Sequence, residues 1–150
     1  MKPLRLLVAF LVLGCIGARA QEARKPEKVD CLCGHLQQEK KTGKQHTGAS
    51  VFENVPVAKA LVYLYPSDSS GNCCLNLIPL EQTTTGKNGF FDFREYSAGN
   101  YWLYVLIGKQ EYKMGIQHKP AKNNAIDCNK FLYTVDKDGK FLMQTVVAAS

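Results

Sequence analysis

The chain has 150 residues, of which 45% are hydrophobic and 21% charged, enough for one domain around a single core. Its formal net charge of +6 falls to +3 without the first twenty residues, which contain Lys2, Arg5, Arg19 and no acid. Such a mild excess, with no aromatic residues among its clustered lysines, excludes the charge footprint of a nucleic-acid-binding protein.

The first twenty residues have the pattern of a secretory signal peptide. A positive start at Lys2 and Arg5 precedes an apolar run at Leu6–Leu13 and a small-x-small cleavage site at Ala18–Ala20. An apolar run of about ten residues is too short for a membrane-spanning helix, which needs roughly 20. We therefore expect residues 1–20 to be removed and the protein to be secreted or periplasmic.

A second interpretation of the same segment is open. Val12-Leu13-Gly14-Cys15 resembles the lipobox of bacterial lipoproteins, in which the cysteine is lipidated and becomes the first residue. Lipid on Cys15 would tether the chain to the cell envelope. The competing Ala-x-Ala site favours plain export, in which Cys15 is discarded with the signal.

The mature chain begins with a polar stretch and a first strand. Residues 21–30 are charged, with a proline and no apolar period, so they predict a flexible segment. The rest, residues 31–150, predicts a single domain. Its first strand is expected at 31–38, and a polar loop is expected at 39–48, where clustered lysines indicate a solvated surface.

The two strongest strands alternate apolar side chains with period two. The second expected strand is 56–65, in which even-numbered residues from Ala60 to Leu64 form one face and odd-numbered residues the other. Tyr101–Ile107 has the clearest strand pattern in the chain, with its odd-numbered residues on one face. Between these strands, Asn88-Gly89 predicts a hairpin turn, because both residues tolerate positive φ.

The remaining strands are shorter. Segments 81–85 and 90–94 are expected on either side of the Asn-Gly turn, a weaker strand at 112–118, and a closing hairpin at 131–135 and 141–147. Its turn, Asp136-Lys137-Asp138-Gly139, has two acids of a calcium-binding loop but lacks the others, which favours the hairpin. Seven or eight short strands predict an all-β, antiparallel β-sandwich.

Five cysteines remain after removal of the signal, and an exported protein meets an oxidising compartment, so two disulfides are expected. The candidates are Cys31, Cys33, Cys73, Cys74 and Cys128. Adjacent residues of a strand point to opposite sides, and a bridge between direct neighbours is strained, so Cys73 and Cys74 are expected to take different partners. One is expected to join Cys31 or Cys33, and the other Cys128. The odd cysteine is left free or pairs between chains.

Metal or redox chemistry is the alternative use of these cysteines. Cys31, Cys33 and His35 offer three ligands within five residues, and His46 or His118 could complete a shell with other cysteines. Structural zinc sites, however, usually space their cysteines as Cys-x2–4-Cys, and exported thiols tend to oxidise before they bind metal. We therefore expect disulfides and no cofactor.

Three stretches carry a family pattern. Pro56–Leu64 follows Pro-x-x-x-Ala-x-Val-x-Leu, and Thr85–Phe93 follows Thr-x-x-x-Gly-x-Phe-x-Phe. Ala98–Val105 follows Pro-Gly-x-Tyr-x-Leu-x-Val, with Ala in place of Pro. These motifs resemble those of the carboxypeptidase regulatory-like family, and the resemblance covers about half of the mature chain. It implies a seven- or eight-stranded prealbumin-like or Ig-like β-sandwich. The matching positions are core faces and turns, so the resemblance implies no activity.

The catalytic patterns of enzymes with related folds are missing. A metallocarboxypeptidase needs a His-x-x-Glu zinc pair, whereas Glu39 follows His35 at four residues. Intradiol dioxygenases need His-x-His, and the histidines of this chain are far apart in sequence. No serine or cysteine has a recognisable base and orienting group beside it. We therefore expect a noncatalytic module.

Four aromatic residues form the candidate binding surface: Tyr63, Tyr65, Trp102 and Tyr104. They alternate out of the faces assigned to the core. An exposed aromatic strip is a usual platform for a sugar ring or a partner protein. The alternative is that both sheet faces are covered and these residues belong to the core. We expect an unidentified protein or glycan as partner, no nucleic acid, and a membrane only if Cys15 is lipidated.

Overall fold

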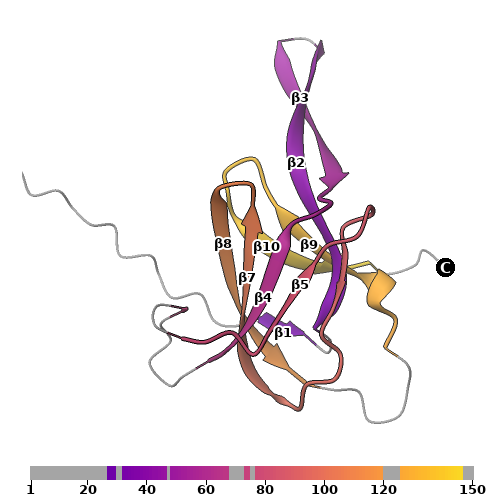
Figure 1. Ribbon diagram of the computed structural model, residues 1–150. Coiled ribbons are helices and arrows are strands. Elements are labelled where there is room, and N and C mark those ends of the chain that lie inside the picture. Colours follow the sequence, from indigo (N-terminus) through magenta and orange to yellow (C-terminus); the bar gives the residue numbers. More distant parts are fainter. Residues whose placement is uncertain are drawn as a thin grey trace, which may run out of the picture.

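The computed structural model describes residues 27–29, 32–46, 48–67, 73–74, 77–119 and 126–146. These residues form ten strands and one short 3₁₀ helix, and the strands make two sheets (Figure 1). The expected signal peptide, Cys15 and Cys31 lie outside the described residues. Within the described part, no helix has the length and apolarity to cross a membrane.

Sheet A has five strands. In spatial order they are β1 (Glu27–Val29), β8 (Gln110–His118), β7 (Gly99–Ile107), β4 (Leu61–Pro66) and β5 (Glu81–Thr84). All neighbours pair antiparallel except β1, which runs parallel to β8. Part of the stretch expected to be flexible is therefore a strand, which corrects the prediction for residues 27–29. Three residues are too few to show a period in the sequence.

Sheet B contains the other strands. Its spatial order is β10 (Phe141–Thr145), β9 (Phe131–Val135), β2 (Cys33–His46) and β3 (Ala49–Pro56), and β6 (Phe90–Asp92) pairs with the start of β2. β2 and β9 are parallel, whereas the other pairs are antiparallel. The chain is thus all-β, with two mainly antiparallel sheets.

The core lies between the inner faces of the two sheets. The inner side chains are large and apolar, as β-branched, aliphatic and aromatic residues favour pleated, buried surfaces. Sheet A contributes Val62, Leu64, Leu103, Val105, Met114 and Ile116, and sheet B contributes Leu36, Phe91, Tyr133, Val135 and Phe141. Phe91 and Tyr133 meet edge to face, with ring centroids 5.0 Å apart.

Two predictions about strands are confirmed. The faces of β4 and β7 are as expected, because the even residues of β4 and the odd residues Leu103 and Val105 of β7 are buried. The closing hairpin is also present as β9 and β10. The Asp136 carboxylate accepts hydrogen bonds from the backbone N–H groups of Asp138 and Lys140, so it fastens the turn.

The predicted hairpin at Asn88-Gly89 is wrong. A turn is present, but β5 belongs to sheet A and β6 to sheet B, so the turn connects the two sheets. Gly89 has φ +79°, and a Cβ there would overlap the Leu36 carbonyl. The Gly89 carbonyl in turn accepts from the Leu36 N–H at 2.9 Å. The glycine is required by this close crossing as well as by its φ.

The prediction of a polar loop at residues 39–48 is also wrong. β2 continues to His46, and the second half of a hairpin, β3, occupies residues that were assigned to no strand. In Figure 1 this hairpin extends away from the two sheets. Nearly all residues of β3 are exposed, so neither face of this strand is buried and its sequence shows no apolar period.

The predicted disulfide pairing is wrong as well. Cys33 is bonded to Cys128, with Cα atoms 5.3 Å apart, and Cys73 is bonded to its neighbour Cys74. The prediction that Cys73 and Cys74 take different partners rests on the alternation of neighbouring side chains along a strand. Cys74 instead has φ +72°, outside any strand, so the two side chains do not point to opposite sides.

We predict that Gly89→Ala destabilises the protein more than Gly139→Ala does. Gly139 has a similar φ of +76°, but a Cβ there meets nothing within 4 Å, so it is a matched control. Gly139→Ala should cost about 1–2 kcal/mol of unfolding free energy for the left-handed backbone, and Gly89→Ala roughly 1–3 kcal/mol more for the overlap. Urea denaturation measures both. Equal losses would contradict the close crossing of Gly89 and Leu36.

Candidate functional site

The four predicted aromatic residues lie together on the outer face of sheet A. Cross-strand pairing places Tyr63 opposite Tyr104 and Tyr65 opposite Trp102, on the face away from the core. All four are half-buried. No described strand or helix packs over this side of the sheet. We call the group Tyr63, Tyr65, Trp102 and Tyr104 the aromatic face.

The three tyrosine rings contact one another. Their centroids are 5.8 Å apart for Tyr63 and Tyr104, 6.1 Å for Tyr65 and Tyr104, and 6.3 Å for Tyr63 and Tyr65. Tyr104 meets each of the others edge to face, an arrangement that the ring quadrupoles favour. The rings therefore hold one another in place, and they present a fixed surface of ring carbon and hydroxyl groups.

The hydroxyl groups of Tyr65 and Tyr104 are kept protonated. Burial, followed by a hydrogen bond to Glu111 and the negative charge of that carboxylate, raises the pKa of Tyr104 to about 12. Burial, with a smaller effect from Tyr63, also raises the pKa of Tyr65. Over the physiological pH range these phenols are neutral groups that can donate and accept hydrogen bonds.

Polar residues flank the aromatic face on both neighbouring strands. Gln82 on β5 lies opposite Tyr63, and Lys113 on β8 lies opposite Tyr104. Glu111, which bonds Tyr104, occupies the same outer face of β8. The sequence prediction missed these three residues, although period-two alternation from the paired positions would have placed them there.

Trp102 lies at one end of the face. Its cross-strand neighbour on β8 is Gly115, so no side chain opposes the indole from that strand. The Trp102 Nε1 atom is buried and has no hydrogen-bond partner in the structure. An indole N–H is a donor only, and burying it without an acceptor is unfavourable.

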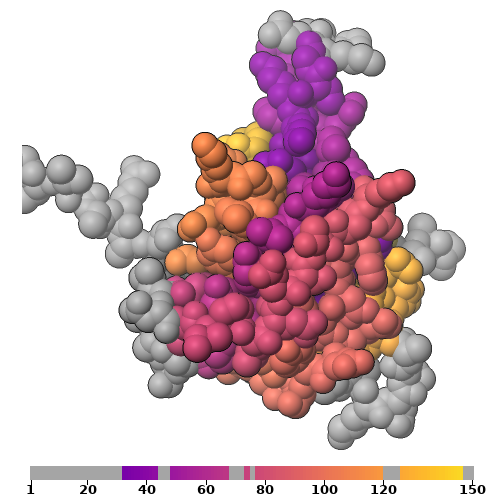
Figure 2. Space-filling view, in the orientation of Figure 1, coloured from indigo at the N-terminus to yellow at the C-terminus, as the bar shows by residue number. Residues whose placement is uncertain are grey.

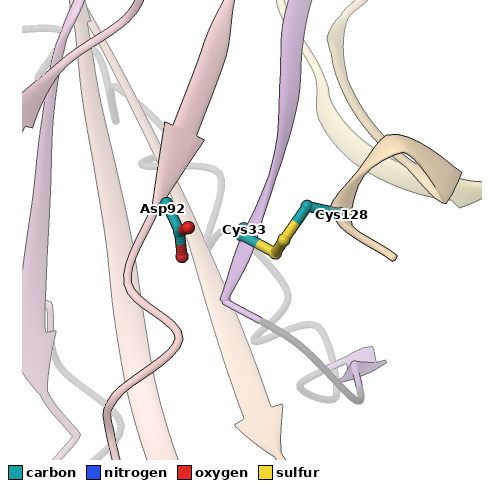
Figure 3. Close-up of side chains that lie close together, drawn as sticks. All are labelled: Cys33, Asp92 and Cys128. Atoms are coloured by element: carbon teal, nitrogen blue, oxygen red, sulfur yellow. A yellow bond between two sulfur atoms is a disulfide. The ribbon is translucent and has the colours of Figure 1, made fainter. Parts of the chain in front are cut away.

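Cys33 and His35 of the metal alternative lie on the outer side of sheet B, whereas Cys31 lies outside the described residues. Figure 3 shows Cys33 on β2 bonded to Cys128 of η1 (Cys128–Lys130), with the Asp92 carboxylate beside them. The two sulfur atoms and an Asp92 oxygen lie within 4.8 Å of one another. Thiolates are the sulfur ligands of metals, so the bridged pair offers none while it is oxidised.

The neighbours of this cluster are bonded to one another. The Asp92 carboxylate pairs with the Arg94 guanidinium at 2.7 Å and accepts from the Arg94 N–H. The ring nitrogens of His35 lie 3.1 Å from the Asn88 carbonyl and 3.0 Å from the Asn129 side-chain oxygen. Cys33 and Cys128 pack with Phe90, Ile126 and Phe131 in a small apolar cluster. This arrangement fastens η1 to sheet B.

A hollow lies beside the start of β5 and the end of β6. It has a volume of about 340 Å³ and is lined by Glu81, Asp92, Phe93, Arg94 and Glu95. Asp92 is paired with Arg94. Burial, and after it the neighbouring Glu81 carboxylate, raises the pKa of Tyr96, so two of the three carboxylates interact with neighbouring side chains.

Comparison with known proteins identifies no relative. No protein-family model matches the chain, and no curated protein matches it. Function is therefore inferred from the residues themselves.

We predict that alkaline pH reports on the Tyr104–Glu111 contact. The unfolded chain releases the Tyr104 proton near pH 10, whereas the folded chain holds it until about pH 12, so folding stability declines as pH rises through this window. Glu111→Gln should lower the pKa of Tyr104 in a spectrophotometric tyrosine titration, because it removes the carboxylate. Tyr104→Phe should abolish the late-titrating step. A titration identical in wild type and Glu111→Gln would contradict the contact.

Proposed function

We propose that the protein is an exported, noncatalytic binding module of the carboxypeptidase regulatory-like, prealbumin-like type, and that it binds a glycan through the aromatic face. The observation that carries this proposal is the packing of Tyr63, Tyr65 and Tyr104 on an outer sheet face over which no described strand or helix lies.

The placement of the three motifs supports the module type. The motif from Pro56 to Leu64 leads into β4, the motif from Thr85 to Phe93 crosses between the sheets, and the motif from Ala98 to Val105 contains most of β7. Each motif therefore supplies core faces and turns of a two-sheet fold. The Cys33–Cys128 bridge supports export, since disulfides are typical of oxidising compartments.

The chemistry of the face favours a glycan. One face of a sugar ring is apolar and stacks on aromatic rings, while its hydroxyl groups need hydrogen-bond partners around them. The tyrosine hydroxyls, Gln82, Lys113 and Glu111 provide such partners on and beside the face. A protein partner is the second candidate, because Leu61 and Leu106 pair across the strands and extend the apolar surface.

The residues also support a noncatalytic role. Acid–base or nucleophilic catalysis needs groups placed together with free valences toward a substrate. In the hollow near Asp92, the Asp92 carboxylate is already paired with the Arg94 guanidinium. The metal or redox alternative, which uses Cys31, Cys33 and His35, is disfavoured because Cys33 is bridged and both ring nitrogens of His35 have partners.

Affinity electrophoresis tests the glycan assignment. The exported chain should be retarded in gels that contain a soluble β-glucan, xylan or chitin oligosaccharide. The double variant Tyr63→Ala with Tyr104→Ala should bind at least about tenfold more weakly, because stacking on two rings is lost. Tyr63→Phe keeps the ring and should lose less.

Ile78→Ala is the control for nonspecific surface effects, since Ile78 is an exposed apolar residue outside the aromatic face. Its migration should equal that of wild type in every gel. Unchanged migration of wild type in all glycans would contradict the assignment, and so would an equal loss in the Ile78 variant.

A further inference from the structure

The hairpin of β2 and β3 extends beyond the sandwich. Its outer part, residues 39–54, is called the arm, and it stands clear of the body in Figures 1 and 2. Every described residue from Gly48 to Asn54 is exposed. Two large apolar side chains are among them, Val51 at 36% and Phe52 at 39% exposure. The arm is therefore a two-stranded ribbon with no apolar layer of its own.

β3 is also an edge strand. It pairs with β2 on one side, and no described residue pairs with its other side. Along its free edge, alternate residues of β3 turn their backbone N–H and C=O groups away from β2. Isolated two-stranded ribbons are marginally stable in water, and long open edges pair readily with further strands. An added strand would supply both the missing pairing and cover for the apolar side chains.

We propose that the added strand is β3 of a second copy of this chain, and that two arms pair antiparallel edge to edge around a two-fold axis. Backbone geometry restricts how they can meet. In an antiparallel pair, two residues directly opposite each other either both point their backbone N–H and C=O groups toward the partner strand or both point them away. These directions alternate along a strand, so two opposite residues of identical strands are separated by an even number of positions. The two-fold axis must therefore pass between a residue and the same residue of the second copy.

Only two centres give nearly full overlap of the strand, because the middle of Ala49–Pro56 lies between Phe52 and Glu53. Centring on Glu53 places two carboxylates opposite each other, and like charges directly opposite are destabilising. Centring on Phe52 places two aromatic rings opposite each other, which is favourable. The charge pattern therefore selects the register with Phe52 opposite Phe52 of the second copy.

The neighbours fit this register. Glu53 then faces Val51 of the other copy, and Lys40 lies opposite Glu53 across its own hairpin. Asn54 faces Ser50, a pair of polar side chains. Lys41 lies beside Phe52 on β2, so the two Lys41 side chains of the dimer are separated by the two β3 strands. No like charges lie directly opposite each other across the new edge.

The pairing leaves the aromatic face free, because that face belongs to sheet A and β3 to sheet B. A dimer would present two such faces, and a polymeric ligand that reached both would gain avidity. The dimer does not depend on the glycan assignment, since each involves different residues.

Analytical ultracentrifugation of the exported chain tests the proposal. We expect a reversible dimer whose fraction rises with concentration. Phe52→Asp should weaken it at least about tenfold, because it places two carboxylates opposite each other. Ile78→Asp, which puts the same charge on an exposed apolar position away from the arm, should leave the dissociation constant unchanged.

A matched pair of double variants tests the register. Ser50→Glu with Asn54→Lys should tighten the dimer, because opposite charges then face each other twice across the axis. Ser50→Lys with Asn54→Lys should weaken it. A chain that is monomeric at all concentrations, a dimer insensitive to Phe52→Asp, or equal behaviour of the two double variants would each overturn the proposal.

Discussion

The register between β4 and β7 determines what both sides of sheet A are made of. Val62 lies opposite Val105 and Leu64 opposite Leu103, which directs the aliphatic side chains into the core. The same pairing directs the tyrosines and Trp102 outward. Because side chains alternate with period two, a shift of either strand by one residue would move the inward side chains of that strand to the outer face and its outward side chains into the core. Burial of the aliphatic residues against sheet B therefore stabilises the register that also assembles the aromatic face.

The parts of the fold that were predictable are those with one buried face. β4 and β7 alternate buried and less buried positions, so the sequence itself carries the period, whereas the closing hairpin was indicated by its Asp136–Gly139 turn. The same alternation is enough to assign the four aromatic residues to the outer face. Their mutual contacts, and the contribution of Glu111, depend on cross-strand register and could not be inferred from a single strand.

The predictions that failed concern segments without such an apolar period. The described residues from Gly48 to Asn54 are exposed on both faces of the arm, and the lysines, glutamine and threonine of residues 39–48 have the composition of a loop. The Asn88-Gly89 turn was recognised, but its role as a connection between sheets depends on the distant Leu36 carbonyl. The Cys33–Cys128 pairing depends on η1 lying against the outer side of β2, a contact between segments 95 residues apart. Contacts of this kind are tertiary and leave no local signature.

The aromatic face and the arm differ in how they are stabilised. The aromatic face rests on a sheet whose other side is a dry core, so its rings are held in fixed positions. The arm has no core beneath it and exposes backbone groups along β3. The first arrangement is suited to recognising a small, rigid ligand surface, and the second to gaining structure from a partner strand.

Cross-strand NOEs measured on isotopically labelled protein test the central claim most directly. The account predicts contacts between backbone protons of Tyr63 and Tyr104, and of Tyr65 and Trp102, with aliphatic contacts from Val62 and Leu103 into the core. Contacts that instead place Tyr63 opposite Leu103 or Val105 would shift the register by one residue. The four aromatic rings would then no longer share one face of the sheet, and the proposed binding surface would not exist.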